Sequence, residues 1–437
     1  MNKFYHSIYL NGKLCKGCYN CIKRCPTEAI RVHNGKAIII KEFCTDCGEC
    51  IRQCPYHAKL ARRDTLDVLE KFEYTVALPT PTLYAQFNNL TDVNIVLSAL
   101  KQMGFDDVFE VAGAAEIISE ESRRYVQENE AKWPIISNAC PAVERLIRVR
   151  FPNLLENLLP IIPPMELAAK LARQKALKET GLDSEKIGII HISPCPAKIT
   201  FPLSPLGITR SEIDASLSVK DIYPVLLSHM KHAENHIENL ACAGKIGLGW
   251  ELNGGEAAGI FTENYLAADG IENCIRVLED LEDQKFNANL EFIELNACNA
   301  GCAGGVLNVE NPYVAKTKLK QLKKYMPVSI SHQSDYTCLK KDDLYFTEPI
   351  QFEPVYQLGS NISENMESLN AMEKLLKTLP GMDCGSCGAP TCRAFAEDVI
   401  RLNAKEYDCI YRLKDHYDQY KNENSNENNK IKKGDSL

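Results

Sequence analysis

Between about residues 66 and 340, short apolar runs alternate with longer stretches of helical periodicity. Four of the runs end in a polar or proline-marked loop, as strands do: Tyr74–Thr80, Trp133–Cys140, Lys186–Cys195 and Leu290–Cys298. Between them lie periodic stretches such as Met165–Thr180, which predict amphipathic helices. This alternation predicts an α/β fold for the region.

The same pattern argues against a membrane protein. No run of about 18 apolar residues is present, and the best candidate, residues 154–172, contains three prolines and two glutamates. Residues 1–14 lack the apolar core of a signal peptide. The net charge is −8 without a basic patch, which disfavours nucleic acid as a partner. We expect a soluble, cytoplasmic protein that binds neither membranes nor nucleic acid.

The chain has 19 cysteines in 437 residues, and they are clustered. Eight lie within residues 15–54, four within residues 384–409, and seven lie between. Disulfides do not persist in the cytoplasm, so clustered cysteines there indicate metal ligands. The distribution predicts a metal-binding region at each end of the chain and a third in the middle.

The first region contains the spacing C-x2-C-x2-C-x3-C-P twice, and it resembles bacterial two-cluster ferredoxins. In such ferredoxins the fourth cysteine of each run ligates the other 4Fe–4S cluster. The resemblance implies one cluster on Cys15, Cys18, Cys21 and Cys54, and a second on Cys44, Cys47, Cys50 and Cys25. A pair of zinc sites is the alternative. A two-cluster ferredoxin carries electrons and does no chemistry by itself.

The last region begins with a glycine-rich loop that carries Cys384, Cys387 and Cys392. Gly385 and Gly388 let the backbone curl around a cluster without a Cβ clash. Helical spacing from Phe395 through Val399 to Leu402 predicts a helix that returns Cys409 as a fourth ligand. The region resembles the small 4Fe–4S domain of corrinoid iron–sulfur proteins and of membrane electron-transport subunits. A zinc site is again the alternative.

In the middle region, three predicted strands end in Cys140, Cys195 and Cys298, and Cys302 follows in the run CNAGCAGG. Sites in α/β folds lie beyond the carboxyl ends of strands, so four cysteines delivered in this way could bind one cluster. Free cysteine is also a common small buried hydrophobe, and the spacing alone does not decide between the two. We interpret Cys274 and Cys338 as packing residues.

The segments NACPA, SPCPAK and ELNACNAGCAGG resemble, in order, the three H-cluster motifs of FeFe-hydrogenases, which also carry an N-terminal ferredoxin module. The resemblance implies that Cys140, Cys195, Cys298 and Cys302 hold a 4Fe–4S cluster. Cys302 would also bridge to a two-iron subcluster with carbonyl, cyanide and dithiolate ligands.

Further pocket residues follow from the same resemblance. It implies that Lys198 donates a charge-assisted hydrogen bond to a cyanide, and that glycines let the backbone approach the metal closely: Gly301, Gly304 and Gly305. Pro81 and Thr82 would line the two-iron pocket. Pro79 and Thr80 are equal candidates because the Pro-Thr pair is repeated.

The sequence departs from the family pattern where protons should move. Efficient members carry a second cysteine at the position of Ala139, and a thiol with a pKa near ~8.5 exchanges protons while a methyl group does not. Leu159 falls where the family has its relay serine. Glu121 aligns with one relay glutamate, but Arg124 then falls near the other.

Two residues expected to line the two-iron pocket also differ from the family pattern. Ser193 and Asn296 stand where methionines usually pack around the two irons. Polar groups beside a metal centre change its potential and its solvent access.

These departures resemble divergent FeFe-hydrogenases thought to be sensors, in particular those with an added C-terminal cluster domain. The resemblance implies slow, reversible H2 oxidation and proton reduction in hydrogen or redox sensing, with four 4Fe–4S clusters and one two-iron subcluster. It also implies electron relay to a redox or signalling protein, and a homodimer is compatible with it.

Two alternatives stay open. One is a catalytic hydrogenase with another proton path through Glu116, Glu120 or Glu121. The other is an iron–sulfur carrier or assembly-type protein without the two-iron centre.

The predicted organisation has five parts. They are a two-cluster ferredoxin domain (1–65), an H-cluster domain of two α/β lobes (66–340), a linking or packing segment (341–375), a small helical 4Fe–4S domain (376–415) and a disordered tail (416–437).

Overall fold

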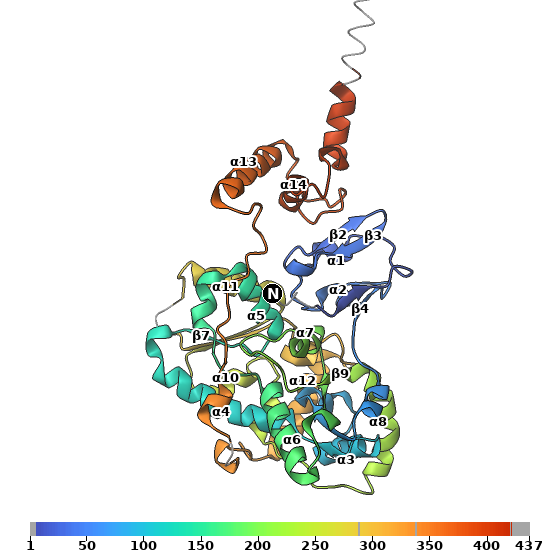
Figure 1. The fold of residues 1–437 in the computed structure, drawn as a ribbon, viewed down its shortest axis with the longest axis vertical. Coiled ribbons are helices and arrows are strands. Elements are labelled where there is room, and N and C mark those ends of the chain that lie inside the picture. The colour runs from blue at the N-terminus through green and yellow to red at the C-terminus, as the bar shows by residue number, and fades with distance from the viewer. Residues whose placement is uncertain (1–5, 287–288, 337–338, 420, 422–437) are drawn as a thin grey trace, which may run out of the picture. The chain divides into compact units, whose positions relative to one another are not determined.

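The computed structural model describes residues 6–286, 289–336, 339–419 and 421 (Figure 1). Cys338 and most of the predicted tail lie outside these residues. The chain forms two compact units. The first unit comprises Met1–Tyr9, Cys44–Gly48 and Leu60–Glu353, and the second comprises Leu10–Phe43, Glu49–Lys59 and Pro354–Leu437.

The first unit contains a four-stranded parallel sheet in the order β6-β5-β8-β9. Its strands are β5 (Tyr74–Pro79), β6 (Asp107–Val108), β8 (Ile187–Ser193) and β9 (Ala215–Ser218). Every residue of β8 is buried, as expected for a central strand covered on both faces. The sheet therefore forms the centre of this unit.

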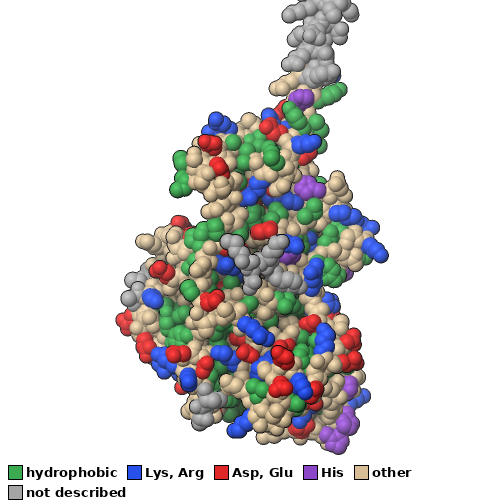
Figure 2. Space-filling view, in the orientation of Figure 1, with side chains coloured by type: hydrophobic (Ala, Val, Ile, Leu, Met, Phe, Trp, Pro, Cys, Tyr) green, Lys and Arg blue, Asp and Glu red, His purple; other side chains and the backbone are tan. Residues whose placement is uncertain are grey.

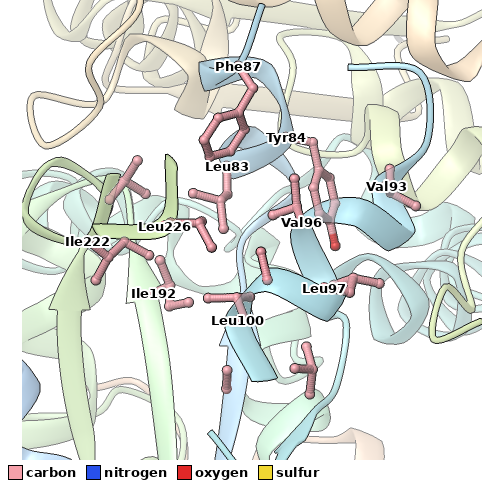
Figure 3. Packing of buried hydrophobic residues seen from close by; sticks show 14 of the residues in the cluster. Leu83, Tyr84, Phe87, Val93, Val96, Leu97, Leu100, Ile192, Ile222 and Leu226 are labelled. Atoms are coloured by element: carbon pink, nitrogen blue, oxygen red, sulfur yellow. The ribbon is translucent and has the colours of Figure 1, made fainter. Parts of the chain in front are cut away.

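Helices cover both faces of that sheet. On one face, Ala77, Ile190 and Ile192 pack in a core with helices α3 (Val93–Gln102) and α8 (Val219–Ala233). Figure 3 shows Leu83, Leu100, Ile192 and Leu226 converging in this core.

On the other face, Val76, Leu78 and Ile189 pack with α4 (Val111–Glu128) and α6 (Pro164–Thr180). Alternate residues of the strands thus face two separate cores.

A second, three-stranded parallel sheet has the order β10-β11-β7. Its strands are β7 (Ile135–Ile136), β10 (Tyr265–Asp269) and β11 (Phe292–Asn296). The remaining helices of the first unit are α5 (Pro141–Arg150), α7 (Pro196–Thr200), α9 (Lys245–Gly249), α10 (Gly255–Ile260), α11 (Ile271–Glu282) and α12 (Pro312–Leu322). Because both sheets are parallel, the loops after their strands leave from the carboxyl edges.

The second unit is built from short elements and two longer helices. These are α1 (Asn20–Lys23), β2 (Ile30–His33), β3 (Lys36–Ile39), α2 (Glu49–Arg52), α13 (Ile362–Thr378) and α14 (Cys392–Ile400). Strands β2 and β3 are antiparallel. β1 (Ile8–Leu10) pairs with β4 (Lys59–Ala61), and each of these two strands contains residues of both units.

The α/β prediction is confirmed, and the predicted helix at Met165–Thr180 is α6. The prediction for the C-terminal helix is wrong in its extent, because α14 ends at Ile400. Leu402 has a φ of +61° and is 90% exposed, so it does not continue the buried face. Asn403 N donates to Asp398 O and closes the helix, and Cys409 is reached through an irregular segment and a short 3-10 turn.

No helix among the described residues is long and apolar enough to cross a membrane. On the face of the molecule seen in Figure 2, basic and acidic side chains are interspersed rather than separated by sign.

Candidate metal centre

The four central cysteines of the sequence prediction all lie beyond the carboxyl ends of parallel strands. Cys140 follows β7 and directly precedes α5, while Cys195 follows β8 and precedes α7. Cys298 follows β11, and Cys302 lies in the next 3-10 turn. Two sheets therefore deliver the four side chains to one place.

Electrostatics show that the four thiols are neighbours. Burial, and then the proximity of Cys298 and Cys140, raise the pKa of Cys195. Burial also raises the pKa of Cys302 well above its ordinary value, against the opposing charge of Lys198. Thiols held this close without a metal disfavour ionisation, whereas a bound iron cluster supplies the positive charge that thiolates need.

The loop that carries Cys302 approaches the loop of Cys195 closely. Leu307 N donates to Pro194 O at 3.0 Å. A Cβ atom on Gly305 would lie 2.3 Å from Pro194 O, so only glycine permits this approach. The second and third motifs are thus joined by backbone contacts.

Lys198 lies on α7 and is buried together with a partner that sequence analysis missed. Its ammonium forms an ion pair with Glu251, and the two side chains are 6% and 1% exposed. Burial opposes the charge on each group. Nevertheless, Cys302 and Glu251 raise the pKa of Lys198, and Lys198 holds the pKa of Glu251 below its usual range. The sequence gives no signal for this pair because Glu251 lies 53 residues further along the chain.

Glu251 also organises the repeated Pro-Thr segment. Thr80 Oγ1 and Thr82 N both donate to Glu251 Oε2. This leaves Thr82 Oγ1 buried without a partner among the described residues, whereas Thr80 Oγ1 is engaged. Of the two candidate registers, Pro81 and Thr82 is therefore the one with a free polar atom for a ligand.

The residues around Cys302 fit a polar metal group. Asn308 Nδ2 donates to Cys302 O at 2.9 Å, and the backbone N of Asn253 lies beside Gly301. Within the described chain, Asn308 Oδ1 and Asn253 Oδ1 are buried without hydrogen-bond partners, as is Thr82 Oγ1. Buried polar atoms normally have partners, so three orphaned atoms on residues that contact Cys302, Gly301 or Glu251 indicate a ligand that completes the site.

One predicted ligand set at the N-terminal end also comes together. Cys15, Cys18, Cys21 and Cys54 line one small cavity in the second unit. Burial raises the pKa of Cys21 to about 11, and the other three thiols add to the effect. The second ferredoxin set, Cys25, Cys44, Cys47 and Cys50, has members in both units and stays a prediction.

The C-terminal set lies within the second unit. Burial, and then the proximity of Cys409 and Cys384, raise the pKa of Cys387. Cys409 is buried and Cys384 is exposed. Cys392 begins α14, and its N–H donates to Asp383 Oδ1 at 2.6 Å. The loop and the segment after α14 thus supply thiols to a common place, although the helix does not return Cys409 itself.

Comparison with known proteins decides the family. The model for "Iron only hydrogenase large subunit, C-terminal domain" matches residues 73–240 and 227–306, together more than half of the chain. The chain belongs to this family. A "4Fe-4S dicluster domain" matches residues 7–55, and an Fe-S cluster domain matches residues 379–411.

The family relatives are distant. The chain is 24% identical over 382 residues to iron hydrogenase 1 of Clostridium pasteurianum, covering 71% of this chain and 66% of that protein. It is 25% identical over 238 residues to the periplasmic [Fe] hydrogenase large subunit of Nitratidesulfovibrio vulgaris, covering 50% and 56%. The chain thus spans less than two thirds of either relative.

A structure of [FeFe]-hydrogenase HydA1 from Chlamydomonas reinhardtii is similar with a TM-score of 0.45 and 13% identity, over 59% of this chain and 86% of that one.

A buried serine and two buried carboxyl groups lie near Ala139. Ala139 N donates to Ser137 Oγ at 3.1 Å, and Ser137 Oγ donates to Glu256 Oε2 at 2.5 Å. Burial raises the pKa of Glu256, and so does the neighbouring Glu294. Burial likewise raises the pKa of Glu294. A pair of buried carboxyl groups with raised pKa values therefore lies next to the cysteine motif.

Sequence analysis missed both members of this carboxyl pair. Glu256 lies on α10 and Glu294 on β11, where Glu294 accepts from Gly254 N, Ala257 N and Asn296 Nδ2. The only signal was a glutamate between the apolar residues Ile293 and Leu295 of the predicted strand.

The glutamates proposed from the sequence have other partners. Glu121 is buried, pairs with Arg124 and accepts from Tyr345 OH. Glu116 accepts four backbone hydrogen bonds, two from the start of α9 at residues 244 and 247 and two from the loop at residues 330–331. Glu120 is exposed and accepts a long bond from Gln333 N. None of these contacts, within the part of the chain that the structure describes, involves a motif cysteine, so the contacts of all three glutamates are structural.

The remaining predicted positions lie around the same site. Ser193 Oγ donates to Cys195 O at 3.0 Å, which occupies its hydroxyl with the motif backbone. Asn296 Nδ2 donates to Glu294 Oε1 at 2.7 Å. Leu159 is fully buried, and its N–H donates to Ile136 O beside the strand that leads to Cys140.

Proposed function

We propose that the chain is an FeFe-hydrogenase-type oxidoreductase that interconverts H2 with two protons and two electrons at a low rate, in hydrogen or redox sensing. The observation that carries this proposal is that the site has all four thiols but has Ala139 beside the first of them. Cys140, Cys195, Cys298 and Cys302 lie together with a buried lysine, yet the residue beside Cys140 has no exchangeable proton. The site can bind the metal group but is poorly connected to protons.

The protein residues would have distinct tasks. The four cysteines would hold a 4Fe–4S cluster, and Cys302 would bridge to a two-iron subcluster. That subcluster, when bound, supplies the metal at which H2 is split or formed. Lys198, kept charged by Glu251, would donate to an anionic ligand, while Pro81, Thr82, Ser193 and Asn296 would line the pocket.

In this proposal, proton transfer to and from the site limits the rate. Positioned acid–base groups typically contribute about 10²–10⁴ in rate, and the Ala139 methyl group contributes none. Glu121 is held by Arg124 and Tyr345, so it would not compensate.

Electrons would pass through the other clusters to a redox or signalling partner. We propose a ferredoxin domain at 1–65, an H-cluster domain at 66–340, a packing segment at 341–375, and a cluster domain at 376–415. The packing segment contains most of α13, and Met372 and Leu375 of α13 pack in a core with Phe395 of α14. We propose a cytoplasmic location because the thiols would be kept reduced there.

One structural observation favours a second candidate, a catalytic hydrogenase with its own proton path. Ser137, Glu256 and Glu294 form a buried polar chain. Ser137 is the member of the chain closest to Ala139 in sequence, and its hydroxyl accepts a hydrogen bond from Ala139 N. A chain of this kind could pass protons without a cysteine. The third candidate, a carrier with cubane clusters only, is disfavoured by the buried Lys198 and by the three orphaned polar atoms.

Hydrogen evolution from a reduced viologen dye, normalised to two-iron content, tests the proposal. We expect measurable but slow turnover. A rate equal to that of a dedicated hydrogenase would overturn the sensory proposal in favour of the second candidate. A fully matured protein without turnover and without a two-iron centre would favour the carrier.

A further inference from the structure

Within the second unit, the loop of the C-terminal thiol set packs against the ferredoxin segment. Val32 N on β2 donates to Gly388 O at 2.8 Å. Gly388 has a φ of +89°, and a Cβ atom there would lie 2.0 Å from Val32 O. Gly388 directly follows Cys387, so one predicted ligand is fixed next to the ferredoxin backbone.

A buried ion pair also joins the ferredoxin segment to the C-terminal segment. Arg31 on β2 pairs with Asp398 on α14, and their side chains are 4% and 5% exposed. A second bond joins Arg31 Nη2 to Asp398 Oδ1 at 3.1 Å, and Arg31 Nη1 donates to Glu28 O at 2.5 Å. A bidentate pair of this kind specifies orientation as well as attachment.

Lys23 connects the two ligand sets more directly. Its ammonium donates to Pro390 O at 2.9 Å and also to Asp383 O. Lys23 lies two residues after Cys21, and Pro390 lies two residues before Cys392. One hydrogen bond therefore joins a residue near the first thiol set to a residue near the second.

We propose that the C-terminal cluster exchanges electrons directly with the cluster on Cys15, Cys18, Cys21 and Cys54, and that Lys23 and Arg31 are the positioning residues for this transfer. The proposal deepens the proposed function and rests on its assignment of both ligand sets. In each step one cluster loses one electron and the other gains it, and no bond or proton changes place. Because Cys384 is exposed, the C-terminal cluster is the one of these two clusters that exchanges electrons with a redox partner.

Magnetic coupling between reduced clusters tests the proposal in the full chain. With both clusters reduced, electron paramagnetic resonance of the wild type should show spin–spin splitting that Cys387→Ala removes along with the C-terminal cluster. Arg31→Met and Lys23→Met should weaken the splitting because each releases the loop. Lys16→Met removes the same charge beside Cys15 from an exposed side chain, and it should leave the splitting unchanged.

Two positioning variants are used because one of them could fail to fold. Arg31 is buried, so Arg31→Met is compared only at wild-type iron content, whereas Lys23 is exposed and its variant should load normally. Absence of splitting between these two clusters in the wild type would overturn the proposal, as would splitting that neither variant changes. Neither readout needs hydrogen turnover or the two-iron centre, so failure of the hydrogenase assignment would be seen separately.

Discussion

Ser137 donates a 2.5 Å hydrogen bond to Glu256, and both side chains are buried beside the cysteine motif. In the resembled hydrogenases, protons leave this place through a cysteine that is Ala139 here. The Ser137–Glu256 pair is a buried pair beside Ala139 through which protons could still move. Testing proton transfer through this pair separates a sensor whose proton path is interrupted from an enzyme that uses a different proton path.

If protons move through this pair, Glu256→Gln should lower hydrogen evolution by about 10²-fold, the lower end of what a positioned acid–base group contributes. Glutamine keeps the shape and the hydrogen bond but holds no transferable proton. Glu263→Gln, an exposed change in the same region, serves as the control. Equal rates in all three proteins at equal two-iron content would exclude the pair from the path.

The protonation of the Glu256–Glu294 pair is measurable by itself. Burial raises the pKa of both carboxyls, so the pair should retain a proton at a pH where exposed carboxyls are ionised. Because these folded-state pKa values lie above the unfolded ones, the stability they contribute is present at low pH and is lost as pH rises through them. Infrared difference spectra near neutral pH should show a protonated carboxyl band that Glu256→Gln or Glu294→Gln removes. Its absence from the wild type would show that both groups are ionised.

Ala139→Cys should raise turnover, but only partly. Leu159 and the Glu121–Arg124 pair still interrupt the family's relay, so we expect at most about a tenfold gain, equal to about 1.4 kcal/mol of barrier. The double change with Leu159→Ser should exceed the sum of the single effects if the links connect. The measurement is viologen-driven hydrogen evolution with infrared control of occupancy. An unchanged rate would move the bottleneck to electron exchange or to the polar pocket at Ser193 and Asn296.

Leu159→Ser should also destabilise the protein. Leu159 is fully buried in the core that α4 and α6 share with the sheet, and truncating such a leucine costs about 2–5 kcal/mol. Denaturant unfolding of the cluster-loaded protein measures the loss. Leu177→Ser, at an exposed position of α6, should change the unfolding free energy little. Equal effects of the two changes would contradict the packing described for Leu159.

The strands could be predicted from the sequence because burial on both faces favours a largely apolar run, as in β8, where His191 and Ser193 are the polar residues. The motif cysteines could be predicted because their segments resemble the family motifs and each of the first three follows a predicted strand, although those strands belong to two different sheets. Glu251 and Glu256 could not, since their partners Lys198 and Ser137 lie 53 and 119 residues away and only folding brings them together. The end of α14 could not be predicted, because helical spacing continues to Leu402 and does not show that Asp398 O accepts from Asn403 N and closes the helix.

Cys302→Ala tests the assignment of the bridging thiol. In the resembled family this bridge is the only covalent protein link of the two-iron centre, so the variant should lose the centre and keep the end clusters. Iron should fall from about eighteen atoms per chain, the sum of four cubanes and two further irons, by at least two. Cys274→Ala should change the iron content little, because Cys274 is a buried packing residue whose thiol lies 3.3 Å from Asn296 O.

The central claim is that this chain binds a two-iron subcluster beside Cys302, and the infrared spectrum of the matured protein tests it most directly. Only that subcluster carries carbonyl and cyanide ligands, whose stretching bands lie apart from those of the protein. We expect these bands in the wild type, with the cyanide bands shifted in Lys198→Met and all of them lost in Cys302→Ala. A protein with all four cubane clusters loaded and no carbonyl or cyanide bands would contradict the account.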